Sequence, residues 1–177
     1  FEPNAALLDS FTGLGELTQV VSRDPIETHR LDDIDTAAGT DLLKLDVQGA
    51  ELMIIENATK TLADTLVVET EAEFVQLYEN QPLFAEVDQE LRRQGFVFHL
   101  FLGFAGRTFK PMLIANDPAR ALSQVLWTEA VYVRDFMALE KLSEKQLLKM
   151  AIILHEAYNS CDLVHLCLQA RDAKTGD

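Results

Sequence analysis

Acidic side chains follow two apolar segments of the chain, and they are the residues whose types and spacing could carry chemistry. Asp46 comes directly after LLKL, and Glu69, Glu71 and Glu73 come after LVV at every second position. Charge at the end of an apolar strand is costly unless water or a partner compensates it. At the end of a strand, Asp46 could face a ligand in the crevice that forms outside the carboxyl ends of α/β strands.

Each acid also has a purely structural interpretation. Asp46 could cap the following helix by accepting amide protons near Gly49 and Ala50. Glu51 lies in the first turn of that helix, where an acid is favoured in any protein, so we interpret it as a helix-start charge. The three glutamates after LVV lie on one side of an extended chain, so their charges repel one another. Either solvation or a bound divalent cation would offset this repulsion.

Other catalytic residue types lack a recognisable pattern. No serine or cysteine lies in a nucleophile elbow, so the sequence gives hydrolase chemistry little support. The two cysteines are six positions apart in an apolar stretch and are expected to be core thiols. No metal-ligand spacing connects the four histidines, His29, His99, His155 and His165.

Composition limits the class of protein. The 177 residues carry 15 Lys and Arg against 29 Asp and Glu, a net charge of −14, which argues against a nucleic-acid partner. No run approaches the roughly 18 consecutive apolar residues of a membrane span, and no signal-peptide pattern opens the chain. We expect a cytoplasmic globular domain without a membrane partner.

Strands and helices alternate through the middle of the chain. Apolar runs predict strands at 42–47 and from 66, and apolar periodicity predicts helices over 50–62 and 83–94. Glu56 and Lys60 are spaced as a stabilising pair on the first helix. Further strands are predicted at 96–102 and 127–134, with mainly loop between them. This order predicts an α/β sheet, whose ligands gather at the carboxyl ends of the strands.

The C-terminal part departs from this alternation. Ser143-Glu144-Lys145-Gln146 is a capping box that opens a helix to about Tyr158, and a second helix is predicted from about Asp162 to Ala170. We therefore divide the chain into an α/β domain at 1–137 and a helical extension at 138–177. The apolar face of the extension is expected to cover the core or a partner subunit.

Two quoted stretches, DLLKLDVQGAELMIIENA and LVVETEAEFVQLYENQPLFAEVDQELRRQGF, resemble the FkbM family of S-adenosylmethionine-dependent methyltransferases. The resemblance covers Ile26 to about Phe101. It implies a class I methyltransferase fold, a Rossmann-like sheet in which LLKLDV corresponds to the fourth strand and LVVET to the fifth. FVFHLFL and WTEAVYVR would then form the final antiparallel pair.

The same resemblance implies roles for residues after the first apolar run. Asp46, Val47 and Gln48 would lie beside the methionine end of S-adenosylmethionine, near the transferred methyl group. Many family members have glutamate where this chain has Gln48. Asp46 is the first candidate for the base that accepts the proton of a substrate hydroxyl, and Glu69 or Glu71 is the second. A divalent cation remains an open alternative.

The beginning of the chain departs from the family pattern. Class I methyltransferases open with a strand and a glycine-rich turn, and no such turn is visible here. Glu2 in FEPN corresponds either to the acid that holds the cofactor ribose or to a variable region just before LDD, and we favour the second assignment. The chain is therefore predicted to be a carboxy-terminal portion that lacks the first strands of the sheet and is not necessarily active alone.

Two functions follow as hypotheses. The first is an O-methyltransferase acting on a hydroxyl of a small molecule or glycan, and the second is a non-catalytic interaction or oligomerisation domain with the same fold. A central parallel strand left at the edge of a sheet exposes unpaired backbone groups. Either that edge or the C-terminal helices could therefore provide the contact of a homo-oligomer.

Overall fold

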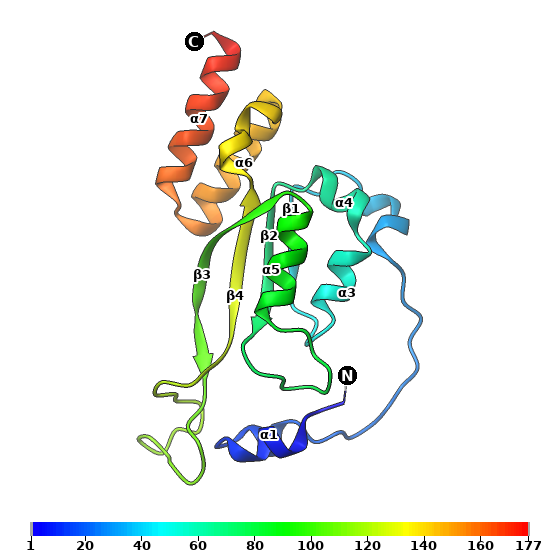
Figure 1. Ribbon diagram of the computed structural model, residues 1–177, viewed down its shortest axis with the longest axis vertical. Coiled ribbons are helices and arrows are strands. Elements are labelled where there is room, and N and C mark those ends of the chain that lie inside the picture. The colour runs from blue at the N-terminus through cyan, green and yellow to red at the C-terminus, as the bar shows by residue number, and fades with distance from the viewer. Residues whose placement is uncertain (1, 177) are drawn as a thin grey trace.

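The computed structural model describes residues 2–176, and its centre is a mixed four-stranded sheet (Figure 1). The strands lie in the order β1-β2-β4-β3, and β1 is parallel to β2 while the other two contacts are antiparallel. This arrangement confirms the α/β class and the predicted antiparallel final pair. The strands are β1 (Leu42–Leu45), β2 (Val67–Glu73), β3 (Phe96–Gly106) and β4 (Val125–Arg134).

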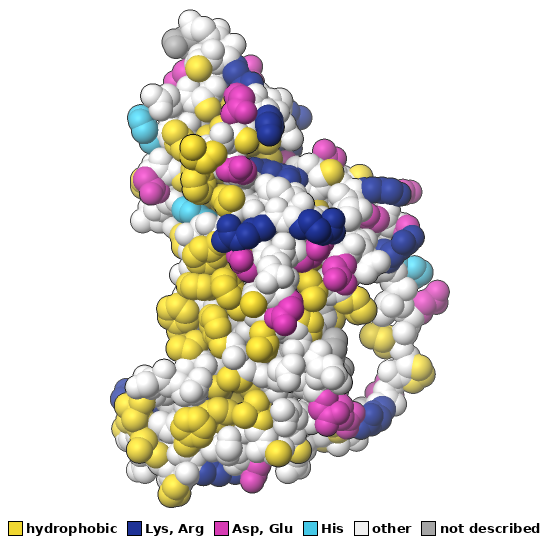
Figure 2. Space-filling view, in the orientation of Figure 1, with side chains coloured by type: hydrophobic (Ala, Val, Ile, Leu, Met, Phe, Trp, Pro, Cys, Tyr) yellow, Lys and Arg dark blue, Asp and Glu magenta, His cyan; other side chains and the backbone are white. Residues whose placement is uncertain are grey.

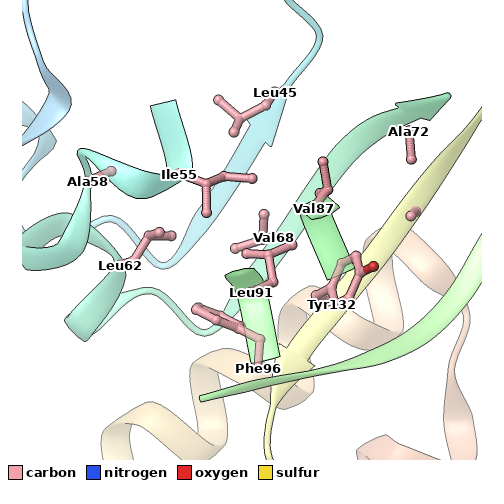
Figure 3. Close-up of a cluster of buried hydrophobic side chains, with 11 residues drawn as sticks. Leu45, Ile55, Ala58, Leu62, Val68, Ala72, Val87, Leu91, Phe96 and Tyr132 are labelled. Atoms are coloured by element: carbon pink, nitrogen blue, oxygen red, sulfur yellow. The ribbon is translucent and has the colours of Figure 1, made fainter. Parts of the chain in front are cut away.

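β2 is a central strand, with β1 on one side and β4 on the other. Its successive side chains point to opposite faces of the sheet, and each face packs against a buried core. Val68 packs with the helices α3 (Glu51–Glu56) and α5 (Phe84–Arg93), which lie on one face. Figure 3 shows Val68 pointing toward Ile55 and Leu91, with Tyr132 of β4 nearby. All of these side chains are fully buried. The apolar run after Leu66 is therefore explained by burial on both sides.

The helices α6 (Glu144–Tyr158) and α7 (Cys161–Thr175) cover the opposite face near one end of the sheet (Figure 1). Val67 of β2 shares a buried cluster with Met150 and Leu154 of α6 and Cys167 of α7. The capping box at Ser143 is confirmed, since its hydroxyl accepts the amide of Gln146 and the Gln146 side chain accepts the amide of Ser143. The predicted second helix is also present and is longer than the sequence indicated.

The predicted single helix over 50–62 is wrong. The structure divides it into α3 and α4 (Thr59–Asp64), which are separated at Asn57 and Ala58. Asp32 provides the physical reason, because its carboxylate accepts the amides of Lys60 and Thr61 at 2.9 and 2.8 Å and so stabilises a second helix start. Glu56 and Lys60 consequently lie on different helices, and no ion pair between them occurs within residues 2–176.

The first strand is also less buried than its apolar sequence indicated. β1 ends at Leu45, two residues earlier than predicted, and it lies at an edge of the described sheet. Leu42 is 37% exposed, while Leu45 is buried against α3. The strand is therefore covered mainly at its carboxyl end, which is the end that leads into the candidate site.

The N-terminal residues form short elements around the sheet. α1 (Ala5–Ser10) and α2 (Leu14–Leu17) lie near the far ends of β3 and β4, at the opposite end of the molecule from α6 and α7 (Figure 1). Residues 18–30 connect them to the 3-10 turns η1 (Leu31–Asp33) and η2 (Asp35–Ala37) without helix or strand. A further 3-10 segment, η3 (Phe136–Lys141), leads from β4 to α6.

β3 forms the other edge of the sheet. Its eleven residues, FVFHLFLGFAG, include no Asp, Glu, Lys or Arg. Leu102 and Phe104 are 45% and 62% exposed, and Figure 2 shows a patch of hydrophobic side chains over this part of the molecule. Among the helices of residues 2–176, none combines the length and apolar character that crossing a membrane requires.

Candidate functional site

The carboxyl ends of β1 and β2 bring two of the predicted catalytic acids together. The two strands are parallel with Lys44 opposite Glu69 and Leu45 opposite Thr70, so the register carries Asp46 toward Glu71. The amide nitrogen of Gln48, Nε2, donates to Asp46 Oδ1 and to Glu71 Oε2, each at 2.9 Å. Gln48 therefore bridges a carboxylate from each strand end.

Glu51 holds the loop that carries these residues. Its carboxylate accepts the amides of Val47 at 2.8 Å and Gly49 at 2.9 Å, and the residue is only 2% exposed. The sequence led us to expect Asp46 in this capping role and to treat Glu51 as an ordinary helix-start charge. The expected capping by Asp46 is wrong, because no side chain caps α3 and the Asp46 side chain is exposed at the strand end. Glu51 does lie in the first turn of α3, as expected, and it also reaches back to hold the loop.

The loop also depends on unusual backbone angles. Gln48 and Gly49 have φ values of 56° and 109°, in the left-handed region that disfavours most side chains. A Cβ atom at Gly49 would lie 3.1 Å from Nε2 of the buried Gln81. Glycine is therefore required there for both its conformation and its small size, and the tight turn places the Gln48 amide between the two acids.

Burial and neighbouring negative charges raise the pKa of two glutamates at this site. Burial, followed by the charges of Asp46 and Glu51, raises the pKa of Glu71 to about 7. Burial and the charges of Glu51 and Glu71 raise the pKa of Glu73 to about 8. Glu73 is 3% exposed. Glu71 and Glu73 are two positions apart in β2, so their side chains lie on the same face of the strand, and this spacing was visible in the sequence. Sequence reasoning did not include Glu73 or Glu51 among the site residues.

Glu69 is held in a separate ionic network. Lys44 Nζ contacts Glu69 closely and Glu129 at 2.9 Å, and the Tyr158 hydroxyl of α6 donates to Glu69 at 2.8 Å. Burial alone would raise the pKa of Glu69, but the hydrogen bonds with Glu129, Lys44 and Tyr158 outweigh it and lower the pKa. The Gln48 bridge does not include Glu69, which acts here as a structural partner of Lys44.

Val47, predicted to contact the cofactor, lines a mainly apolar cavity of about 550 Å³. The cavity lies between the segment 26–31 and α3, and its walls include Leu31, Met53 and Ile54. Val47 itself is 41% exposed. The loop after β1 therefore separates an acidic region, which contains Asp46 and Glu71, from an apolar cavity.

Glu2 lies at a different cavity. Its carboxylate pairs with Arg23 at 2.5 Å, and both residues line a space of about 370 Å³ together with Tyr78. The backbone of this segment is tied to the loop after β2, since the Glu79 amide donates to the Glu2 carbonyl at 2.8 Å. The favoured assignment of Glu2 to the variable region before LDD, rather than to the acid that holds the ribose, stays a prediction.

Metal binding gains no support from the described part of the chain. Within residues 2–176, no group of three or more His, Cys, Asp or Glu side chains is arranged to hold a metal ion. The carboxylates of Asp46 and Glu71 are instead linked through the Gln48 amide.

Comparison with known proteins agrees with the resemblance drawn from the sequence. The family model of the methyltransferase FkbM domain matches residues 3–98, which include β1, β2 and the loop that carries Asp46. The chain belongs to the FkbM methyltransferase family. The matched residues end within β3, so β4 and the α6 and α7 helices of this FkbM protein lie beyond the match.

One curated relative matches a shorter part of the FkbM chain. It is the 2-O-methyltransferase NoeI of Sinorhizobium fredii, which is 45% identical over 67 residues. The alignment covers 36% of this chain and 28% of the relative, so the chain spans less than a third of that protein's length. No solved structure matches the chain.

Proposed function

We propose that this chain forms one wall of the active site of an S-adenosylmethionine-dependent O-methyltransferase. The observation that carries the proposal is the Gln48 bridge, which joins Asp46 and Glu71 at the carboxyl ends of two parallel strands. Ligands of α/β sheets bind at this edge, and a glutamate whose pKa is about 7 can exchange a proton near neutral pH. Family membership and the name of the curated relative support the same reaction class.

The residues of the site fit the chemical groups of the cofactor. S-adenosylmethionine carries a positively charged sulfonium and ammonium, and the acids at the strand ends provide negative charge that the described residues leave partly uncompensated. Asp46 and Gln48 would hold the methionine end, as the sequence predicted. The mainly apolar cavity beside Val47 would receive the adenine, because its walls include the apolar side chains of Leu31, Met53 and Ile54.

The bound cofactor would supply a methyl group on a positively charged sulfur. Asp46 and Glu71 would orient the acceptor hydroxyl and take its proton, with Gln48 fixing the separation between the two carboxylates. Of the two, Glu71 is partly buried and has the pKa suited to a base at neutral pH. We therefore reverse the order of the sequence-based candidates and assign Glu71 as the base and Asp46 as the positioning group. Glu69 is proposed to support the site through Lys44.

The proposed acceptor is a hydroxyl of a small molecule or glycan. The relative's printed name specifies methylation at a 2-O position, and a sugar or polyol hydroxyl is the class of acceptor that this name suggests. The proposed activity belongs to the complete active site, of which this chain forms one wall, since the match covers only 28% of the relative.

Cofactor binding is the first test. Isothermal titration of the chain with S-adenosylhomocysteine should give measurable heat, and Asp46→Asn should weaken binding by about tenfold through the loss of roughly 1.4 kcal/mol. Exposed Glu79→Gln serves as a matched control and should bind like the parent chain. If any longer polypeptide that contains this chain also binds no S-adenosylhomocysteine, the methyltransferase proposal fails.

Catalysis is the second test, performed on whichever form binds the cofactor. Replacing Glu71 by Gln keeps the Gln48 bridge but removes the proton acceptor, so kcat should fall by roughly 10²- to 10⁴-fold. The KM for S-adenosylmethionine should change little, and the pH profile should lose its rise near pH 7. An unchanged kcat in Glu71→Gln would show that another group accepts the proton.

A non-catalytic interaction domain is the second candidate function. It is favoured by the position of β1 at the edge of the described sheet and by exposed apolar side chains on α6, including Leu148 at 41% and Ile152 at 53%. This candidate predicts a homo-oligomer through the sheet edge or the C-terminal helices. Light scattering after size-exclusion chromatography should then give a dimer that Ile152→Glu converts to a monomer.

A further inference from the structure

A serine and a histidine from distant parts of the chain meet outside the strand-end site. Ser160 lies in the turn between α6 and α7, and His99 lies on the edge strand β3. The serine Oγ and the histidine Nε2 are 2.7 Å apart. Ser160 is 7% exposed, so water competes little for its hydroxyl. The contact joins a potential nucleophile directly to a potential base.

The Ser160 hydroxyl does not cap the helix that follows it, although the residue lies at the N-cap position. Ser160 is the N-cap residue of α7, yet its side chain makes no capping hydrogen bond. Ser143 holds the same position at the start of α6, and there the hydroxyl accepts the Gln146 amide at 3.2 Å. Helix capping therefore explains the side chain of Ser143 but leaves that of Ser160 unexplained.

Asp162 supplies the charge that such a pair needs. Its Oδ1 accepts from the Ser160 hydroxyl at 3.2 Å and from the Leu163 amide at 2.8 Å, while His99 Nε2 lies nearer to the serine oxygen, at 2.7 Å. Burial lowers the pKa of His99, while the charge of Asp162 acts in the opposite direction. The imidazole is thus neutral near pH 7 and able to accept a proton, and Asp162 stabilises the imidazolium that results.

A cavity of about 350 Å³ adjoins this group. His99 and Asp162, the two side chains hydrogen-bonded to Ser160, both line it, together with Phe136, Leu163, His165 and Leu166. The apolar members suit a short acyl chain, and His99 and Asp162 connect the cavity to Ser160. The Leu163 amide in the first turn of α7 already donates to Asp162, and the positive end of this helix favours negative charge near Ser160.

We propose that Ser160 and His99 form a second active site, which hydrolyses carboxylic esters with a short apolar acyl group. This site is independent of the strand-end acids and of the proposed methyl transfer, because it uses β3 and the turn between α6 and α7.

The proposed reaction has two steps. Ser160 Oγ attacks the ester carbonyl carbon while His99 Nε2 takes the hydroxyl proton, and that proton then passes to the departing alkoxide, so an alcohol leaves and an acyl-serine remains. Water attacks the acyl-serine, His99 takes a proton from the water, and returning it to Ser160 Oγ releases the carboxylic acid. Charge at the carbonyl oxygen would be stabilised by the amides at the start of α7.

A fluorophosphonate probe and p-nitrophenyl butyrate test the proposal on the complete chain. The probe should label the parent at Ser160, as located by peptide mass spectrometry, and the parent should hydrolyse the ester. Ser160→Ala should abolish labelling and lower the hydrolysis rate at least roughly 10²-fold. His99→Gln should lower both by a similar factor while circular dichroism remains that of the parent.

Two control variants separate this site from its surroundings. Ser143→Ala removes the capping serine of α6, which has the Gln146 amide as its partner, and it should leave labelling and hydrolysis unchanged. Cys161→Ser removes the exposed thiol next to Ser160 and should also behave like the parent. Absent labelling of the folded parent, or labelling that persists in Ser160→Ala, would overturn the proposal.

Discussion

At the scale of single residues, Glu73 has the most strongly displaced pKa of the strand-end acids. Its ordinary value is 4.5 and its value in the fold is about 8, so between these limits the folded chain holds a proton that the unfolded chain has released. The free energy of unfolding must therefore decrease as the pH rises through this range. The contribution of Glu73 is most favourable below about pH 4.5 and is lost by about pH 8.

The predicted decrease in the free energy of unfolding with rising pH can be tested with one substitution. Glu73→Gln should raise the free energy of unfolding near pH 8 by on the order of 2 kcal/mol and change it little near pH 4, because glutamine resembles the protonated acid. Urea unfolding at the two pH values measures the difference. Glu79→Gln, at an exposed position in the same segment, is the control and should show no such dependence on pH. A Glu73→Gln variant that is less stable than the parent at both pH values would contradict the assignment.

Glu69 shows the opposite shift from Glu73, because its pKa is lowered, and Lys44 is its ion-pair partner. Lys44→Met should remove the cation between Glu69 and Glu129 and decrease the free energy of unfolding near pH 7 by about 1 to 2 kcal/mol. A lowered carboxyl pKa stabilises the fold above its ordinary value of 4.5, and that contribution disappears as the pH falls through the folded value.

The loss caused by Lys44→Met should accordingly become smaller in acid. Denaturant unfolding at about pH 7 and about pH 3 checks this expectation. Lys145→Met, at an exposed site on α6, is the matched control. An equal loss at both pH values would mean that packing of the lysine stem, and not the ion pair, is responsible.

At the scale of elements, the C-terminal helices share a core with the sheet. Leu154 of α6 is fully buried in the cluster that contains Val67 and Val131 of the central strands. The helical extension predicted from the sequence is therefore in continuous apolar contact with the α/β part, and the two parts should unfold together.

Substitution on α6 measures this coupling. Leu154→Ala should decrease the free energy of unfolding by about 2 to 5 kcal/mol, whereas Ile152→Ala, at a position 53% exposed, should cost well under about 1.5 kcal/mol. Fluorescence of Trp127 on β4 and the far-ultraviolet helix signal should give the same transition midpoint. Two separate transitions would show that the extension is an independent unit.

At the scale of the whole molecule, the formal net charge is −14, and the raised pKa values of Glu71 and Glu73 mean that these two acids are fully charged only above about pH 8. Like charges repel one another in the compact state, and salt screens this repulsion over a Debye length of about 10 Å at 0.1 M. Raising the concentration of sodium chloride should therefore increase the melting temperature.

At about pH 9, where both side chains are ionised, the double variant Glu71→Gln with Glu73→Gln should reduce that increase, because it removes two charges from the crowded site. Calorimetry at low and moderate salt measures both effects, and equal concentrations of sucrose provide an uncharged control for the salt. A melting temperature that falls with salt would show that favourable ion pairs, such as Lys44 with Glu69, dominate the charge balance.

Local patterns in the sequence determined the elements and the place of the site. Unbroken apolar runs predicted strands near Leu45 and Val68, and the capping box at Ser143 predicted the start of α6, because each depends on neighbouring residues. The same runs ended in acids, and Asp46 with Glu71 indeed meet, since the ends of adjacent parallel strands must lie at one edge of the sheet.

Only the tertiary structure determined the contacts that each acidic side chain makes. Glu51 holds the loop, Glu69 pairs with Lys44 and Tyr158, and Asp32 divides a helix that periodicity predicted to be continuous. The contact between Ser160 and His99 spans 61 positions in the chain. Such hydrogen bonds and pKa values depend on distance in space and on burial, and neither is determined by spacing along the sequence.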